Sequence, residues 1–205
     1  VASIQTERLH EDARGEHRIK ARQYLRLARS LIDVPDHPRL VLMHGVSASG
    51  KTFTSGKLVT TMPAIRVRSD LERKRLHGLP RQQHSRSGIE SGLYSGSATE
   101  RTYMTLARHC ENGLKAGFNM IADATFLDRA WRVQFIELAL KLGARPIILE
   151  CSAPREILQR RIRQRAAEGL DESEADLAVL EHQWAHLDPL DDEERLLVVQ
   201  DYRDL

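Results

Sequence analysis

The sequence predicts an α/β fold in which helices cover both faces of a parallel β-sheet. Short apolar segments alternate along the 205-residue chain with longer segments whose apolar residues recur at helical spacing. This alternation is typical of strands joined by helical crossovers, and a parallel sheet buried on both faces needs apolar strands. A turn rich in glycine and serine follows the first such strand and precedes a helix. The turn therefore lies at the carboxyl edge of the sheet, where ligands bind in folds of this class.

The first half of the domain is expected to contain two strands, two helices and a long loop. Glycine and proline at residues 78 and 80 end the second helix. The loop at 81–97 contains three glycines and five serines, and loops of this length in a compact domain are usually functional or mobile. The strands are expected at 40–43 and 64–68, and the helices at 51–62 and 70–77.

The second half continues the alternation with three strands and four helices. Gly117 and Gly143 end two of the helices, and Pro154 opens a third at its first turn, where proline is tolerated. Ser173 is expected to cap the last helix, which runs to about Leu187. The strands are expected at 119–122, 145–151 and 195–200, and the first three helices at 99–114, 129–142 and from 154 onward.

The chain is expected to divide into an N-terminal helical extension with its linker, 1–38, and one domain at 39–205. Apolar residues three and four positions apart predict an amphipathic helix at 10–33, and Pro35 and Pro38 end it.

The overall charge does not favour nucleic acid or a membrane surface as the partner. Thirty-one basic and 29 acidic residues give a net charge of +2, so any basic function has to be local to a cleft. No apolar run is long enough to span a bilayer. Cys110 and Cys151 have no metal-type spacing and are expected to be ordinary buried thiols, which favours a reducing, cytoplasmic location.

A phosphate-binding loop is the strongest motif in the sequence. Residues 45–52 match the pattern G-x-x-x-x-G-K-[ST] in full, between an apolar strand and a helix. Inward-facing backbone N–H groups and the helix N-terminus bind phosphate oxygens, while Lys51 reaches the β- and γ-phosphates and the Thr52 hydroxyl binds Mg²⁺. The alternative is a chance glycine turn with a surface lysine. The residues expected to bind the nucleotide are Gly45, Val46, Ser47, Ala48, Ser49, Gly50, Lys51 and Thr52.

Two further strand ends carry candidate site residues. Asp70 follows the second strand, where a carboxylate can accept the proton of an acceptor hydroxyl, and Arg73 lies one helical turn later on the same side. Asp123 and Thr125 follow the third strand. Asp123 is a candidate for holding Mg²⁺ through water, or for orienting Asp70 or the acceptor, and Thr125 is a candidate for binding the acceptor. The alternative for both aspartates is that they cap helices.

The helix that begins near Pro154 carries five arginines. Arg161 and Arg165 are four residues apart and share one face, whereas Leu158 and Ile162 mark the buried stripe. Arginines on a mobile segment can close over ATP and neutralise the charge that develops on the transferred group. The alternative is a solvated basic face.

The order of these motifs resembles the small P-loop kinases of the AAA_33 type. The resemblance covers about 39–200 and rests on the phosphate loop, Ser69-Asp70 with Arg73, 91–95, 123–126 and the arginine-rich helix. Such kinases occur as the C-terminal half of proteins whose N-terminal half looks like an aminoglycoside phosphotransferase. The resemblance therefore implies a P-loop three-layer sandwich with five parallel strands in the order 2-3-1-4-5, ATP with Mg²⁺, and an upstream domain before Val1.

Related families add detail to this resemblance. The polynucleotide kinase pattern implies Asp70 as the general base and Arg73 as a partner of the reacting groups. The segments 180–183 and 187–190 are similar to the pattern of gluconate kinases. The expected function is therefore ATP-dependent transfer of the γ-phosphoryl group to a hydroxyl of a small molecule: a sugar, a sugar acid or an aminoglycoside-like acceptor. A polynucleotide 5′-hydroxyl kinase and a nucleotide-dependent regulatory module without an acceptor stay open as alternatives.

Overall fold

The computed structural model describes residues 18–22, 24–25, 37–80, 95–168 and 176–205. The chain divides into two compact units, Val1–Asp36 and His37–Leu205. In the first unit, 18–22 and 24–25 are helical, and the rest of the expected helix at 10–33 lies outside the described residues. The expected boundary at residue 38 stays a prediction. No helix in the described part of the chain is both long and apolar enough to cross a membrane.

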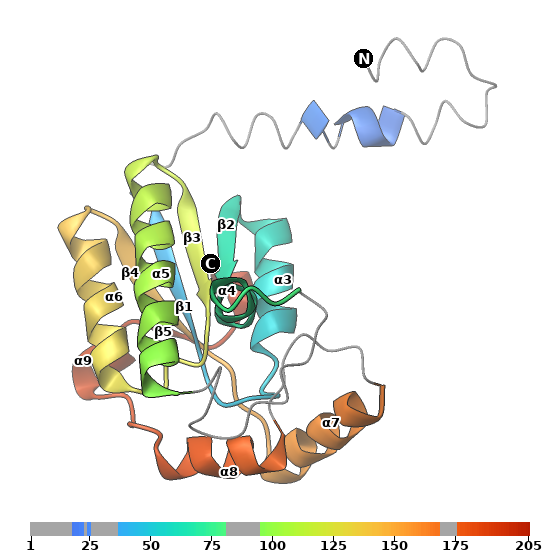
Figure 1. Ribbon diagram of the computed structural model, residues 1–205. Helices are drawn as coiled ribbons and strands as arrows, with labels where there is room; N and C mark the ends of the chain where they lie inside the picture. The colour runs from blue at the N-terminus through green and yellow to red at the C-terminus, as the bar shows by residue number, and fades with distance from the viewer. Residues whose placement is uncertain (1–17, 23, 26–36, 81–94, 169–175) are drawn as a thin grey trace. The chain divides into compact units, whose positions relative to one another are not determined.

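The second unit is built on a five-stranded parallel sheet with the order β2-β3-β1-β4-β5, as expected (Figure 1). The central strand β1 pairs on both sides, so Leu42 lies opposite Ala122 of β3 and Ile148 of β4. The strands are β1 (Arg39–His44), β2 (Ala64–Arg68), β3 (Asn119–Asp123), β4 (Arg145–Glu150) and β5 (Val198–Val199).

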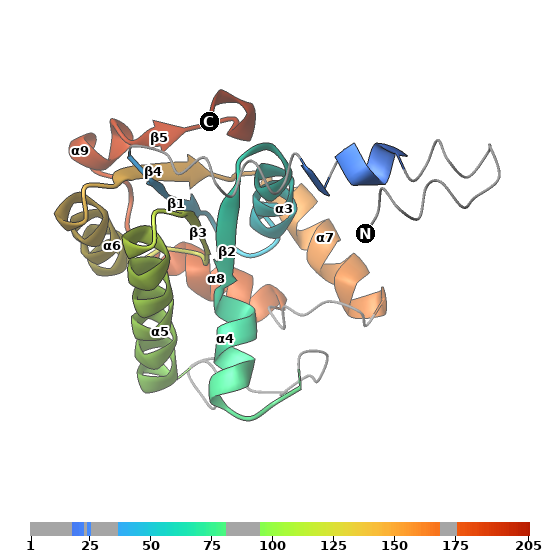
Figure 2. The same ribbon diagram turned by 90° about the horizontal axis from the view of Figure 1, so that it is seen from above.

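Helices cover both faces and the carboxyl edge of this sheet (Figures 1 and 2). The segments α5 and α6 lie on one face, α3 lies on the other, and α7 and α8 lie beyond the carboxyl ends of the strands. The helices are α3 (Lys51–Thr61), α4 (Ser69–Leu76), α5 (Gly96–Lys115), α6 (Arg129–Lys141), α7 (Arg155–Glu168), α8 (Leu177–Ala185), α9 (Asp192–Arg195) and the 3₁₀ helix η2 (Tyr202–Asp204).

Alternating residues of β1 divide the core into two layers, because successive side chains of a strand point to opposite faces. Leu40 and Leu42 pack with α5 and α6 in one cluster, and Val41 and Met43 pack with α3 in the other. A third cluster joins Val46 of the phosphate loop to α7 and α8. The two helices beyond the strand ends are thereby attached to the loop itself.

A buried ion pair joins α6 to α9. Arg132 is fully buried, its Nε donates to Glu194 Oε1 (2.7 Å) and one Nη donates to Oε2 (3.0 Å). The same guanidinium donates to the carbonyls of Phe126 and Leu127 in the loop after β3.

At the amino edge of the sheet, Arg39 donates to the carbonyl of Leu205, so the start of β1 lies beside the last residue.

Three expectations were wrong in detail. Arg195 belongs to α9 rather than to a strand, because Asp191 and Glu194 form a capping box, and β5 is shorter than expected. Helix α5 begins at Gly96 rather than Thr99, because Ser95 caps it. Cys151 is only half-buried, whereas Cys110 is buried as expected.

Two expectations fall on residues that the structure does not describe. The expected loop at 81–97 lies outside the described residues except for 95–97, and so does the expected cap at Ser173. The described cap of α8 is Asp176, which accepts a hydrogen bond from the backbone N–H of Val179.

Candidate active site

The phosphate loop has the backbone that its glycines allow. Gly45 adopts a φ of 138° and Gly50 a φ of 107°, values that residues with a side chain rarely adopt. A Cβ atom on Gly45 would lie 2.1 Å from the carbonyl oxygen of Cys151. The loop therefore needs glycine at position 45 for both its conformation and its packing.

Lys51 lies inside the loop rather than on the surface. It is 8% exposed, and its Nζ donates to the carbonyls of Gly45 and Val46, each at 2.8 Å. Burial lowers the pKa of Lys51, and the carboxylates of Asp123 and Asp70 oppose that shift. The two carboxylates thereby favour the charged ammonium, which is the form that binds phosphate oxygens.

A cavity of about 570 Å³ opens at the carboxyl edge of the sheet, next to this loop. It brings together residues of the loop, the starts of α3 and α4, the end of β3 and the arginine-rich helix α7. The expected site residues that line it are Ser47, Ala48, Gly50, Lys51, Thr52, Asp70, Asp123, Thr125, Arg161 and Arg165. Gly45, Val46, Ser49 and Arg73 are absent from the lining, although the first three belong to the loop.

Asp70 lies at the second position of α4, directly after β2. Burial raises the pKa of its carboxyl, Arg73 opposes the shift, and Asp123 adds to it. A carboxyl with a raised pKa, in one cavity with a phosphate loop, has the properties of a general base. Because Arg73 opposes the rise in the pKa of Asp70, its guanidinium lies close enough to interact with that carboxyl.

Asp123 ends β3 and is 5% exposed. Its Oδ2 accepts a hydrogen bond from Ser55 Oγ (2.9 Å), and Arg68 Nε lies 3.8 Å from the same oxygen. Carboxylate and hydroxyl oxygens are the ligands that Mg²⁺ prefers, and Thr52 and Asp123 supply both to one cavity. This donor set fits the expected assignment of Thr52 and Asp123 to the metal.

Thr125 lies in a loop that is held from two sides. Its carbonyl accepts a hydrogen bond from the N–H of Gly45 (3.1 Å), and its hydroxyl lies 3.4 Å from the hydroxyl of Tyr103. The Tyr103 hydroxyl also accepts from the N–H of Phe126 (3.2 Å), a residue with a φ of 48°. The phosphate loop and the end of β3 are thus joined directly.

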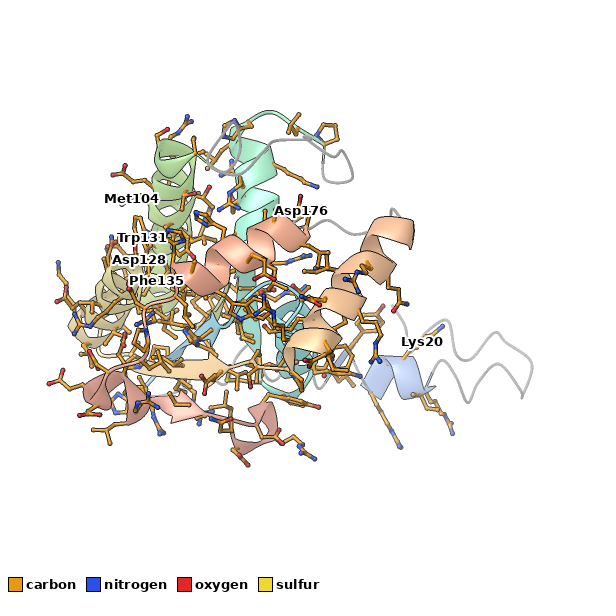
Figure 3. The ribbon with its side chains drawn as sticks, turned by 90° about the horizontal axis from the view of Figure 1, so that it is seen from below. Lys20, Met104, Asp128, Trp131, Phe135 and Asp176 are labelled. Carbon is orange, nitrogen blue, oxygen red and sulfur yellow. The ribbon has the colours of Figure 1, made fainter. Side chains whose placement is uncertain are left out.

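Aromatic packing fixes the position of Tyr103. Its ring stacks on Trp131 with centroids 4.8 Å apart, and Phe126 and Phe135 meet it edge to face. Figure 3 shows Trp131 and Phe135 on α6, beside Asp128, which caps that helix. A buried, hydrogen-bonded hydroxyl in a rigid aromatic cluster is suited to holding a loop in one conformation.

The arginines of α7 divide into two groups. Arg161 and Arg165 both line the cavity. Arg161 also donates to the carbonyl of Ala48 (2.9 Å). Arg155 points elsewhere, since its guanidinium lies 4.7 Å from the Trp184 ring and pairs with Glu181. Leu158 and Ile162 are buried, which confirms the predicted stripe.

Several residues that shape this site belong to none of the predicted motifs. Ser55 and Arg68 bind Asp123, Tyr103 holds the loop of Thr125, and the amide oxygen of Gln183 accepts a hydrogen bond from the N–H of Ser47 (2.7 Å). These contacts join segments that are far apart in the sequence, so no local pattern shows them. For Gln183, the expected resemblance of 180–183 to gluconate kinases was the sequence signal.

Residues 40–190 match the model of a protein family, AAA_33, an AAA domain. The chain belongs to the AAA_33 family. A comparison with proteins of curated function finds no sequence match.

Solved structures confirm the fold of this AAA_33 protein. It is similar to a sugar kinase from Janibacter sp. HTCC2649, with a TM-score of 0.55 and 19% identity over 81% of this chain and 86% of that one. It is also similar to a gluconokinase from Sinorhizobium meliloti 1021, with a TM-score of 0.53 and 16% identity over 81% and 83%. Kti12 from Chaetomium thermophilum gives a TM-score of 0.55 and 16% identity over 78% and 88%. Family and fold together support a nucleotide-dependent function of the P-loop kinase type.

Proposed function

We propose that this protein is an ATP-dependent phosphotransferase that moves the γ-phosphoryl group to a hydroxyl of a small molecule. The observation that carries the proposal is that Asp70 and the phosphate loop line the same cavity. A nucleotide-binding module without an acceptor does not need a carboxyl of raised pKa in the cavity beside its phosphate loop. The sugar kinase and the gluconokinase among the similar structures agree with a small polar acceptor.

The chain's residues take the following roles in the proposed reaction. Asp70 accepts the proton of the acceptor hydroxyl while the oxygen of that hydroxyl bonds to the γ-phosphorus. The bond between the γ-phosphorus and the oxygen that bridges it to the β-phosphate breaks, which releases ADP. Lys51, Arg161 and Arg165 neutralise the charge on the transferred group. Mg²⁺, held by Thr52 and Asp123, would neutralise further phosphate charge.

Acceptor-dependent release of ADP tests the proposal. Sugars, sugar acids and aminoglycosides are screened with ATP and Mg²⁺, and the variant Asp70→Asn is compared on any acceptor found. Loss of a general base should lower kcat by about 10²- to 10⁴-fold. Asp192→Asn, which changes an exposed carboxylate on α9, is the matched control and should leave kcat unchanged.

The other outcomes identify the alternatives. Transfer of labelled phosphate to an oligonucleotide would indicate a polynucleotide kinase. Nucleotide binding without any acceptor-dependent release, or equal turnover in the wild type and in Asp70→Asn, would indicate a nucleotide-dependent module. The likeness to Kti12, whose structure is a complex with ADP-AlF3, makes that second comparison necessary.

A further inference from the structure

An exposed aromatic ring lies at the mouth of the cavity and has no part in the roles assigned so far. Phe53 directly follows Thr52 on α3 and is 70% exposed, yet it lines the same cavity as the phosphate loop. Phenylalanine usually buries its ring, because the ring contributes stability only when it is removed from water. An exposed ring inside a ligand cavity therefore points to a ligand that covers it.

The turn of α3 directs Phe53 away from the acceptor side of the cavity. Ser55, two residues later, binds Asp123, and successive residues of a helix are rotated by about 100°. Phe53 thus points to nearly the opposite side of the helix from Asp123. The carboxyls of Asp70 and Asp123 lie close enough to interact, so the acceptor on which Asp70 acts lies on the Asp123 side. With the phosphates at the helix N-terminus, the nucleoside is left on the Phe53 side.

Cationic groups lie near this ring. Arg161 lines the same cavity as Phe53, and its guanidinium lies 3.9 Å from where a Cβ on Gly50, the N-cap of α3, would be. Lys57 places its Nζ 5.6 Å from the centroid of the Phe53 ring. A flat aromatic face with cations around it suits the π-system of a nucleobase.

We propose that the ring of Phe53 stacks on the base of the bound nucleotide and supplies affinity for the nucleoside part. The inference rests on the proposed nucleotide binding, and it adds the residue that holds the base. Every base has a π-face, so this contact adds affinity for purine triphosphates without selecting between adenine and guanine.

Binding measurements with and without a base test the inference. Calorimetry is used to measure ATP, GTP and inorganic tripolyphosphate on the wild type, Phe53→Ala and Phe53→Tyr. In Phe53→Ala we expect ATP and GTP to bind about ten- to a hundredfold more weakly and tripolyphosphate to bind as before, whereas Phe53→Tyr should retain all three affinities. Val59→Ala, which removes an exposed apolar side chain from the same helix outside the cavity lining, is the matched control and should change nothing.

The outcomes separate this inference from the function on which it rests. Unchanged ATP affinity in Phe53→Ala would overturn base stacking while leaving phosphate binding intact. Equal weakening of ATP and tripolyphosphate would overturn it too, since Phe53 would then act through the loop. If the wild type bound neither ATP nor tripolyphosphate, both the proposed function and this inference would be wrong. Circular dichroism confirms that each variant is folded.

Discussion

We expect Glu194→Ala to destabilise the domain strongly, because the substitution leaves the charge of Arg132 buried without its carboxylate. The side chain of Arg132 is 0% exposed and that of Glu194 is 4% exposed, so water cannot replace the lost partner without opening the packing between α6 and α9. The two hydrogen bonds of this pair are 2.7 and 3.0 Å long. Glu194 Oε2 also accepts from the N–H of Asp191, so the substitution removes half of a capping box as well.

The magnitude follows from the burial of both partners. Removing one partner of a buried ion pair costs about 3–5 kcal/mol, because the other charge stays desolvated. For a domain of this size, each kcal/mol lowers the melting temperature by about 2–4 °C. The melting temperature of Glu194→Ala should therefore fall by roughly 6–20 °C. Glu194→Gln keeps the volume and a capping acceptor, so its loss should be smaller.

Thermal and urea unfolding followed by circular dichroism measure this effect. Glu111→Ala is the control, since Glu111 pairs with Lys115 on the exposed face of α5 and its removal should leave the midpoint unchanged. A similar shift for Glu194→Ala and Glu111→Ala would show that the Arg132 charge is solvated after all. The account of a desolvated pair would then be wrong.

Three further changes have definite expected outcomes. Gly45→Ala should abolish nucleotide binding in calorimetry, because the new Cβ would meet the Cys151 carbonyl at 2.1 Å. Tyr103→Phe should fold normally but weaken acceptor binding, seen as a higher KM, since the N–H of Phe126 loses the hydroxyl on α5 to which it donates. Asp70→Asn should raise the melting temperature at pH 8 and lose that gain toward pH 4. Burial raises the pKa of Asp70 in the folded chain, so the stability that it contributes is present below its unfolded pKa and falls as the pH rises through the folded value.

The sequence was sufficient to predict the framework because that framework follows from local rules. Apolar strands separated by helices predicted the sheet, and the glycine-lysine loop could be placed at its carboxyl edge with Asp70 and Asp123 nearby. The last strand is shorter than predicted, and a local pattern in the sequence accounts for the difference. Asp191 and Glu194 are three residues apart in the spacing of a capping box, which marks the start of a helix.

The contacts that complete the site could not be predicted from one sequence. Asp123 receives its partners from α3 and from β2, and which side chains meet there depends on the register of three elements. The hydrogen bond that the Phe126 N–H donates to the Tyr103 hydroxyl depends likewise on how α5 packs on the sheet. The exposure of Phe53 in the cavity depends on how α3, α4 and α7 are arranged, so the sequence did not predict it.

The hydrogen bond from Arg39 to the Leu205 carbonyl has a practical consequence for engineering. It brings the beginning of the first strand and the last residue to one spot, at the sheet edge opposite the cavity. In a chain shortened to begin at Arg39, a linker can therefore join Leu205 to Arg39 in a circular permutant, with new termini opened at the exposed turn of Gly143. A fluorescent reporter fused after Leu205 would likewise lie away from the cavity beside the phosphate loop.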